Sequence, residues 1–169
     1  MVIMSIDQAK KSGVCVFERD EDDYKLIYHD LISSKFENYE DVIIDLSNKI
    51  GRLIDEYHPE IILFEDVQNQ GSPLTHKNLS MLLGCLIKTC DIKNVQYEII
   101  PCATWRKILR QNLSYHGKRA ERKDYKNASK EFVKTKYGLK VNDDIADAIS
   151  MGSYYIEFKV GDVDGWIKC

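Results

Sequence analysis

Three carboxylates lie within five residues of one another near the end of the chain, in the stretch 142–149 (NDDIADAI). In a helix, side chains three positions apart project from the same face, so Asp144 and Asp147 are expected to lie together. Asn142 or Asp143 is a natural N-cap, and the simplest interpretation is an acidic helix start that complements the helix dipole. The alternative is a divalent cation site, because hard cations prefer oxygen ligands.

The apolar spacing over 143–158 predicts a helix and indicates which of its sides faces the core. The expected core stripe consists of Ile145, Ile149, Gly152 and Ile156. Asp144 and Asp147 lie on one flank of this stripe, where an unpaired carboxylate is costly and a bound cation would compensate for it. The opposite, solvent side is expected to carry Asp143, Ser150, Tyr154 and Glu157.

Two further acids end predicted strands. Asp7 closes the apolar run at 2–6, and Glu65 follows the continuous apolar run at 61–64, which is typical of a buried strand. If these strands are neighbours, their acids meet at one edge of the sheet, and a helix packed there adds the other two. Four converging carboxylates would repel one another. Two Mg²⁺ ions about 4 Å apart, which Mn²⁺ can replace, would relieve that repulsion and support phosphodiester cleavage.

The remaining pattern predicts an α/β protein with a five-stranded mixed sheet and helices on both faces. The expected strands are 1–7, 13–17, 24–32, 61–64 and 95–100, and the expected helices are 38–57, 75–90, 104–109, 120–137 and 143–158. One domain should span 1–158, followed by a loose tail at 159–169. The leucine stripe of the helix at 75–90 serves either core packing or contact between two copies of the chain.

Composition narrows the class of protein. The five cysteines are scattered and form no CxxC pair, so neither a disulfide framework nor a zinc site is indicated. No apolar run approaches the length of a membrane span, and the first residues have a strand pattern rather than a signal peptide. A cytoplasmic protein with reduced thiols is therefore expected.

Positive charge is concentrated in one segment. Residues 102–140 carry twelve Lys and Arg against three Asp and Glu, whereas the rest of the chain carries twelve against 24. A basic block inside an acidic protein indicates a polyanion partner on one face, although a solvated lysine-rich helix has the same composition.

These residues resemble those of a known family. An Asp that ends strand one with a Gly six residues later (Asp7, Gly13), a Glu that ends strand four (Glu65) and the run Asp144-Ile-Ala-Asp147 resemble the RuvC family of Holliday junction resolvases. That family belongs to the ribonuclease H-like superfamily. The stretch 101–107 (PCATWRK), followed by Gly-Lys-Arg, is similar to the bacteriophage branch of the family. The resemblance covers about residues 1–158.

The resemblance implies a homodimeric, Mg²⁺-dependent endonuclease that nicks a four-way DNA junction symmetrically and could also cut other branched DNA. If phage-encoded, it would act in the cytoplasm of a bacterial host. The metal ligands fall on Asp7, Glu65, Asp144 and Asp147. A catalytic basic residue falls on Lys123, or else on Lys126, and a second falls near Arg106 or Lys107. The residues expected to bind DNA are Arg106, Lys107, Lys118, Arg119, Arg122, Lys126, Gln68 and Asn69.

Two departures from the family pattern keep alternatives open. Gln8-Ala9 stands where cellular members often carry Pro-Gly, and the residues 67–70 (VQNQ) lack the aromatic wedge of the best-known bacterial members. One alternative is a ribonuclease H-like nuclease that acts on replication forks or on RNA–DNA hybrid. The other is a non-catalytic dimer that binds branched DNA.

Overall fold

Five strands form one mixed sheet with β1 at its centre in the computed structural model, which describes residues 1–20, 23–68, 72–113 and 120–160. The strands are β1 (Val2–Asp7), β2 (Lys11–Arg19), β3 (Tyr24–Ser33), β4 (Ile61–Glu65) and β5 (Gln96–Ile100). The helices are α1 (Tyr39–Tyr57), α2 (Pro73–Lys93), α3 (Cys102–Trp105), the 3₁₀ helix η1 (Arg106–Asn112), α4 (Arg122–Tyr137), α5 (Asp143–Tyr155) and the π-helical turn η2 (Ile156–Val160).

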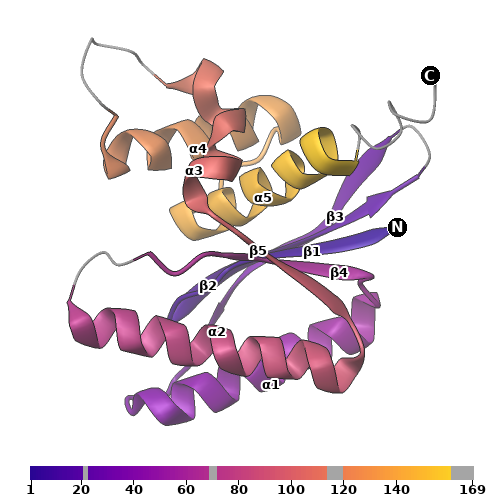
Figure 1. Cartoon of the computed structure of the whole chain (residues 1–169). Coiled ribbons are helices and arrows are strands. Elements are labelled where there is room, and N and C mark those ends of the chain that lie inside the picture. Colours follow the sequence, from indigo (N-terminus) through magenta and orange to yellow (C-terminus); the bar gives the residue numbers. More distant parts are fainter. Residues whose placement is uncertain (21–22, 69–71, 114–119, 161–169) are drawn as a thin grey trace.

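The strand order is β3-β2-β1-β4-β5. β1 is antiparallel to β2 and parallel to β4, with Ile6 opposite Phe64 and Asp7 opposite Gly13. The carboxyl ends of β1 and β4 therefore meet at the same edge of the sheet, on the left of Figure 1. The predicted mixed sheet, and the predicted adjacency of the strands that carry Asp7 and Glu65, are both confirmed.

Helices cover both faces of the sheet, as predicted (Figure 1). Alternate residues of β1 divide between two cores because successive side chains of a strand point to opposite faces. Met4 and Ile6 pack under α1 and α2, whereas Ile3 packs on the side of α5. Both cores are closed by buried apolar residues, so the sheet edge that carries the acids rests on a rigid support.

Helix α5 differs from its predicted orientation. Ser150 and Tyr154 were expected on the solvent side, but they are only 0% and 6% exposed. The reason is that α5 lies between the sheet and the layer formed by α4 and η1, so nearly every side of it is covered (Figure 1). A helical wheel assumes one wet face, and this helix has almost none.

Most other helices begin or end within a few residues of the predicted positions. α2 begins earlier than predicted because the Ser72 hydroxyl caps it, accepting the Thr75 N–H at 3.1 Å, and it runs on to Lys93. Its leucines Leu82, Leu83 and Leu86 are buried, so the stripe is core packing. The helix predicted at 104–109 is α3 followed by η1, and the helix predicted at 143–158 becomes π-helical from Ile156.

The predicted C-terminal tail is only partly within the described residues. Lys159 and Val160, expected in the tail, belong to η2, while 161–169 and the loop at 114–119 lie outside the described residues. Within the described ranges, no helix combines the length and the hydropathy needed to cross a membrane. Four of the five cysteines are described, and these four are free thiols.

Gly13 allows α5 to approach the sheet. An ideal Cβ at this position would lie 2.0 Å from the carbonyl oxygen of Asp144 and 2.6 Å from the backbone nitrogen of Ile145. Real Cβ atoms do not approach backbone so closely. Because Gly13 is the partner of Asp7 in the ladder, the absence of its side chain places the first turn of α5 directly beside the end of β1.

We expect Gly13→Ala to lower the free energy of unfolding by about 3 kcal/mol or more, because overpacking against backbone cannot be relieved by rotating a side chain. Gly84→Ala is the matched control, since Gly84 is exposed in α2 and nothing lies within 4 Å of an added Cβ. That control should gain about 0.5–1 kcal/mol from helix propensity. Chemical denaturation of both variants tests this, and equal stability of the two would contradict it.

Candidate active site

Four carboxylates come together at the carboxyl ends of β1 and β4. Asp7 ends β1, Glu65 ends β4, and Asp144 and Asp147 occupy the first two turns of α5. The pKa of Asp7 is raised well above its ordinary value, first by burial and then by the negative charges of Glu65, Asp147 and Asp144. The four acids that the sequence singled out therefore act on one another electrostatically.

The start of α5 separates the neighbouring acids Asp143 and Asp144. Asn142 is the N-cap, and its Oδ1 accepts the Ile145 N–H at 2.9 Å. Asp143 turns toward α4, where its oxygens lie 3.0 Å from Lys126 Nζ and 2.9 Å from Lys130 Nζ. Hydrogen bonds from these two lysines lower the pKa of Asp143. The neighbouring Asp144 is the residue whose charge reaches Asp7.

Glu65 is anchored at one oxygen. The Trp105 indole Nε1–H donates to Glu65 Oε1 at 2.9 Å. Burial raises the pKa of Glu65, while the Trp105 hydrogen bond and then the positive charges of Arg106 and Arg122 act to lower it. The second carboxylate oxygen accepts no hydrogen bond within the described part of the chain, so it can serve as a ligand.

Asp147 is similarly fixed. The Ser129 hydroxyl of α4 donates to Asp147 Oδ1 at 2.5 Å, and the carboxylate is only 9% exposed. Burial raises the pKa of Asp147 to about 6, although the Ser129 hydrogen bond opposes that shift. A buried carboxylate that titrates near 6 is unusual for a structural residue and typical of a functional one.

Gln8 holds the two strand ends together. Its side-chain Nε2 donates to the Glu65 carbonyl, and its Oε1 accepts the Glu65 N–H at 3.1 Å. The amide thus continues the β1–β4 ladder by one step beyond the last paired residues, Ile6 and Phe64. Gln8 is buried, so these bonds are shielded from water and fix the relative positions of Asp7 and Glu65.

The donor set fits hard divalent cations, because four carboxylates offer oxygen ligands and their mutual repulsion would be relieved by positive charge. As the side chains lie, no three His, Cys, Asp or Glu groups of the described residues form a ready-made metal cluster. Glu65 and Asp147 each have one oxygen hydrogen-bonded to another side chain, Trp105 and Ser129 respectively.

The basic residues divide into two groups. Lys126 lies among the acids, 3.9 Å from Asp144 Oδ1, and its charge lowers the pKa values of Asp7 and Asp147. Lys123, one turn earlier, is exposed and forms no ion pair with any described acid. The structure thus brings the second candidate of the sequence analysis, not the first, to the acids.

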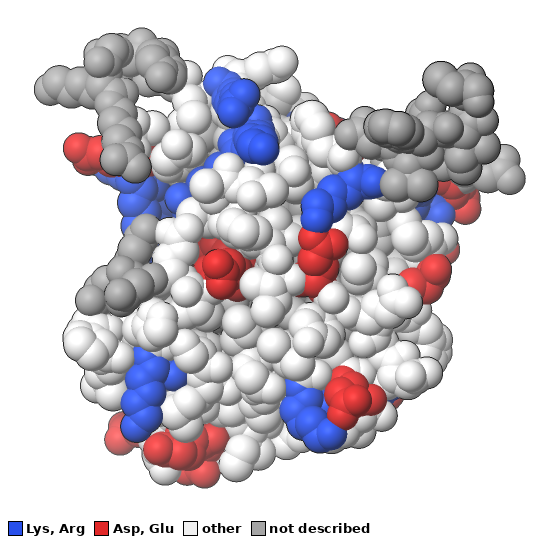
Figure 2. Space-filling model, viewed as in Figure 1, with Lys and Arg blue, Asp and Glu red and all other residues white. Residues whose placement is uncertain are grey.

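The other basic residues lie over α3, η1 and α4. Figure 2 shows Lys and Arg side chains over this layer at the top of the view, with acidic side chains below. Arg106 stacks between Trp105 and Tyr125, 5.3 and 4.8 Å from the ring centroids. Lys107 and Arg122 are exposed nearby. The Gln68 amide Nε2 donates to Cys102 Sγ at 2.8 Å. The predicted DNA-binding residues Asn69, Lys118 and Arg119 lie outside the described residues.

Sequence reasoning missed four residues of this site: Gln8, Trp105, Tyr125 and Ser129. Trp105 and Ser129 are far in sequence from the acids they contact, and Tyr125 contacts Arg106 instead of an acid. Gln8 follows Asp7 in the sequence, but it bonds to Glu65. A glutamine directly after the acid of a central strand was the only available signal. The arginines that lower the pKa of Glu65 were expected to bind DNA, but not to compensate the acids.

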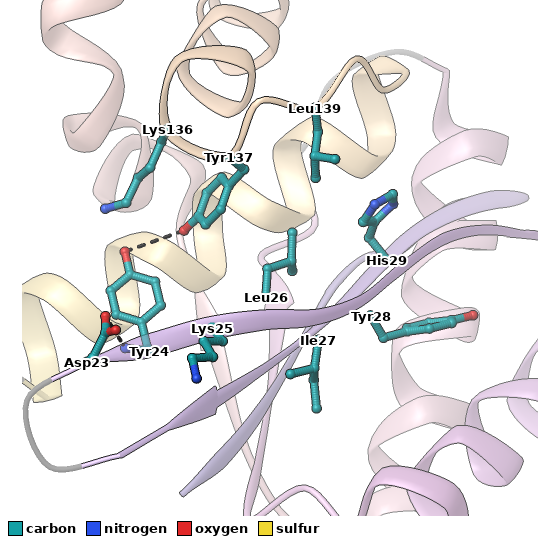
Figure 3. Close-up of a pocket in the computed structure, with 10 residues that line it drawn as sticks. All are labelled: Asp23, Tyr24, Lys25, Leu26, Ile27, Tyr28, His29, Lys136, Tyr137 and Leu139. Atoms are coloured by element: carbon teal, nitrogen blue, oxygen red, sulfur yellow. Dashed lines mark hydrogen bonds between the residues drawn. The ribbon is translucent and has the colours of Figure 1, made fainter.

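The described surface has a large hollow away from the acids. A cavity of about 960 Å³ lies between β3 and the end of α4, and none of the four acids lines it. Figure 3 shows Lys136 and Tyr137 above the strand, with the Tyr137 hydroxyl donating to that of Tyr24 at 3.4 Å. A smaller hollow of about 160 Å³ is lined by Glu65, and another of about 410 Å³ shares Gln68, Arg106 and Arg122 with it. Size alone would therefore not lead to the four acids.

The fold is shared with known structures. No family model matches the sequence, and no curated protein matches it. Among solved structures, the chain is similar to T. thermophilus RuvC in complex with Holliday junction substrate, with a TM-score of 0.73 and 14% identity over 94% of this chain and 97% of that one. The five-stranded mixed sheet and its helices are thus the ribonuclease H-like fold, as predicted.

Two further structures agree. A second Thermus thermophilus RuvC structure has a TM-score of 0.68 and 17% identity, covering 93% of this chain and 96% of that one. The yeast mitochondrial Holliday junction resolvase Ydc2 has a TM-score of 0.62 and 16% identity, covering 94% and 78%. At these identities the likeness establishes the fold and leaves the activity to be argued from the site.

The raised pKa of Asp147 predicts how metal-free stability depends on pH. Because its folded pKa of about 6 exceeds the ordinary 3.8, the folded state binds this proton more tightly than the unfolded state does. The resulting stability is present at low pH and is lost as the pH rises through about 6. In EDTA, Asp147→Asn should therefore match wild type near pH 4 and exceed its free energy of unfolding by about 1–3 kcal/mol at pH 7.5.

Asp143→Asn is the control, because its expected change in the free energy of unfolding at pH 7.5 has the opposite sign. Its pKa is lowered, so its charge stabilises the fold above the ordinary 3.8, and this variant should lose stability at pH 7.5. Denaturant titrations at the two pH values measure both differences. A wild type more stable than Asp147→Asn at pH 7.5 in EDTA would contradict the repulsion inferred among the four acids.

Proposed function

We propose that the protein is a divalent-metal-dependent endonuclease that resolves four-way DNA junctions by paired symmetric nicks. The observation that carries the proposal is the set of four interacting carboxylates at the carboxyl ends of β1 and β4 and the start of α5. The likeness of the fold to RuvC solved with a Holliday junction substrate supports the choice of substrate. The resemblance of residues 101–107 to phage resolvases supports a phage-encoded enzyme of the host cytoplasm.

Two Mg²⁺ ions, or Mn²⁺ in their place, would be held by Asp7, Glu65, Asp144 and Asp147. When bound, such a pair activates a water and stabilises the leaving oxygen of a phosphodiester. Asp7 is the natural ligand to be shared by both ions, because it ends the central strand and the charges of the other three carboxylates act on its pKa. Glu65 and Asp144 approach from opposite sides of Asp7, so each suits one ion.

Asp147 suits the role of general base or metal ligand. Its Oδ1 accepts from Ser129, which leaves Oδ2 to take a proton from the attacking water. An acid whose pKa lies near 6 can hold and release a proton close to neutral pH. Ser129 orients this carboxylate, and Trp105 does the same for Glu65.

Lys126 is the better candidate than Lys123 for neutralising charge on the scissile phosphate, since it already lies beside Asp143 and Asp144. Arg106, Lys107 and Arg122 would follow the DNA backbone, reading its shape more than its sequence. Four lysines and arginines of the α3–η1–α4 layer line one hollow and form no direct ion pair with a described acid, although two of them act on Glu65 from a distance: Arg106, Lys107, Arg110 and Arg122.

The alternatives differ in what they require. A nuclease for forks or RNA–DNA hybrid needs the same acids and a different substrate surface. A non-catalytic binder of branched DNA has no use for a buried Asp147 whose raised pKa lowers stability. The retention of this costly arrangement favours an enzyme.

A homodimer is part of the proposal, because symmetric nicks need two active sites. α2 presents an exposed apolar row that the core does not use: Leu74, Met81 and Ile92, exposed by 64%, 39% and 69%. Spacings of seven and eleven residues place them on one face of the helix. Tyr97 and Ile99 of the edge strand β5 are also exposed and apolar, beside the same layer.

Asp144→Asn should slow cleavage of a four-way junction by about 100-fold or more, as expected when charge at a phosphoryl-transfer site is removed, while leaving junction affinity intact. Asp143→Asn is the matched comparison, since Asp143 pairs with Lys126 and Lys130 and is not among the proposed metal ligands; this variant should cut faster than Asp144→Asn. Gel assays on end-labelled junctions, with and without Mg²⁺, measure both.

The same assay separates the alternatives when it includes a fork, linear duplex and RNA–DNA hybrid. Paired nicks at symmetric positions of the junction support the proposal. Cutting of hybrid alone, or binding without any cutting in Mg²⁺ or Mn²⁺, would refute it. Normal cutting by Asp144→Asn would show that the metal ligands are assigned wrongly.

We expect Met81→Lys to convert the dimer to a monomer, because a charge would be buried in an apolar contact. Ile44→Lys provides the control, since Ile44 is 58% exposed on α1, away from the proposed contact. Sedimentation equilibrium reports the mass of each variant. A wild-type protein that remains monomeric when saturated with junction DNA would contradict the dimer.

A further inference from the structure

We propose that the hollow between η1 and the start of α4 binds one unpaired nucleotide of the branched substrate, next to the scissile phosphate. This subsite rests on the proposed function and adds to it the feature of the DNA that is recognised. Its volume is about 410 Å³, and its walls include Gln68, Arg106, Lys107, Arg110, Arg122 and Tyr125.

The charge of the hollow indicates an anion. Four of its lining side chains are Lys or Arg, and no Asp or Glu lines it. None of the four cations forms an ion pair with a described acid, whereas Lys126, Lys130 and Lys136 on the neighbouring α4 all do. Arg106 and Arg122 act on Glu65 only from a distance, and Lys107 and Arg110 project into the same concavity, so a phosphate group is the partner that this concentration of positive charge fits.

The shape and the side-chain types indicate a nucleobase beside that phosphate. The Arg106 guanidinium lies 4.8 Å from the Tyr125 ring centroid, and these two planar groups form one wall. Arg106 Nε is buried and has no hydrogen-bond partner among the described residues. Bases stack on tyrosine rings and guanidinium planes, and a donor left without a partner can be satisfied by a base edge or a phosphate oxygen.

The hollow leads directly to the acids. Gln68, Arg106 and Arg122 also line the smaller hollow that contains Gln8 and Glu65. A strand whose scissile phosphate lies at the four acids would therefore place an adjacent nucleotide in the larger hollow. A base in an intact duplex cannot enter a concave site, because it is stacked and paired, so occupancy favours an unpaired nucleotide at a branch point.

This subsite gives branched DNA a means of recognition without an aromatic wedge after Glu65. The energy of stacking one base would repay the cost of unpairing it, and that cost is least at the centre of a junction or at a fork. Linear duplex would have to break a pair to reach the same contact. The selectivity then comes from Tyr125 and Arg106 rather than from residues 67–70.

The test is a double-mutant cycle that removes the protein side chain, the DNA base or both and compares the Kd for the junction. The Kd is measured in EDTA so that no cutting occurs. Each junction carries a single abasic site, placed at a different one of the nucleotides that flank the expected cleavage position. For wild type, one position should weaken binding about tenfold, as expected for one lost base stack. For Tyr125→Ala, the intact junction should bind about tenfold more weakly, and the abasic site at that position should add nothing.

Two variants complete the cycle. Tyr125→Phe keeps the ring and should behave as wild type, and Tyr39→Ala removes a half-buried tyrosine from the far side of the sheet and should leave the abasic profile unchanged. If Tyr125→Ala does not fold, Arg106→Lys replaces it, because lysine keeps the charge and removes the planar group. It too should abolish the effect of the abasic site.

The outcomes separate the two proposals. If no abasic position is coupled to Tyr125 or Arg106 while junctions are still bound and nicked, the nucleotide subsite is wrong and the resolvase proposal stands. If junctions are neither bound nor nicked, the proposed function itself fails. The last measurement adds millimolar deoxyadenosine monophosphate as a competitor. It should displace the junction from wild type but not from Tyr125→Ala, because the hollow takes a single nucleotide. Equal displacement from both proteins would contradict the subsite.

Discussion

Repulsion among buried carboxylates is the constraint on which the rest of the structure depends. Asp7 lies at the end of the central strand with three other acids acting on its pKa, and burial adds to their effect. The fold tolerates this because each neighbour supplies partial compensation. Trp105 and Ser129 donate hydrogen bonds, and Lys126 and Arg106 supply positive charge. The compensation is incomplete, so bound cations would stabilise this site further.

The backbone holds the acids in place against that repulsion. The ladder between β1 and β4 would end before the acids, but the amide of Gln8 extends it to Glu65. Gly13 allows the first turn of α5 to lie against the sheet, and the Asn142 cap fixes where that turn begins. The positions of the four carboxylates are therefore set by main-chain contacts, which side-chain repulsion cannot easily displace.

Sequence patterns predicted the mixed sheet, the adjacency of β1 and β4, and the meeting of the four acids at one edge of the sheet. They could do so because strand periodicity and the carboxyl-end rule depend on local residue types. They failed for α5, where Ser150 and Tyr154 are buried, because the pattern of one helix does not reveal that two layers enclose it. They also failed for Trp105 and Ser129, which reach their acids from distant parts of the chain. The choice between Lys123 and Lys126 needed the relative rotation of α4 and α5, which spacing within one helix does not give.

The separation of positive charge into two groups follows from the same repulsion. Lys126 is held among the acids by Asp143 and Asp144, so it offsets their charge and contributes little to a long-range field. The cations of η1 and the start of α4 form no direct ion pair with a described acid and would attract DNA, whereas the carboxylates beside them would repel a phosphate. In the proposed function, the basic layer would capture DNA without metal, whereas a scissile phosphate would approach Asp7 only when bound cations neutralise the carboxylates. Capture and cleavage would then fall on adjacent surfaces of opposite charge, and the bound metal would join them.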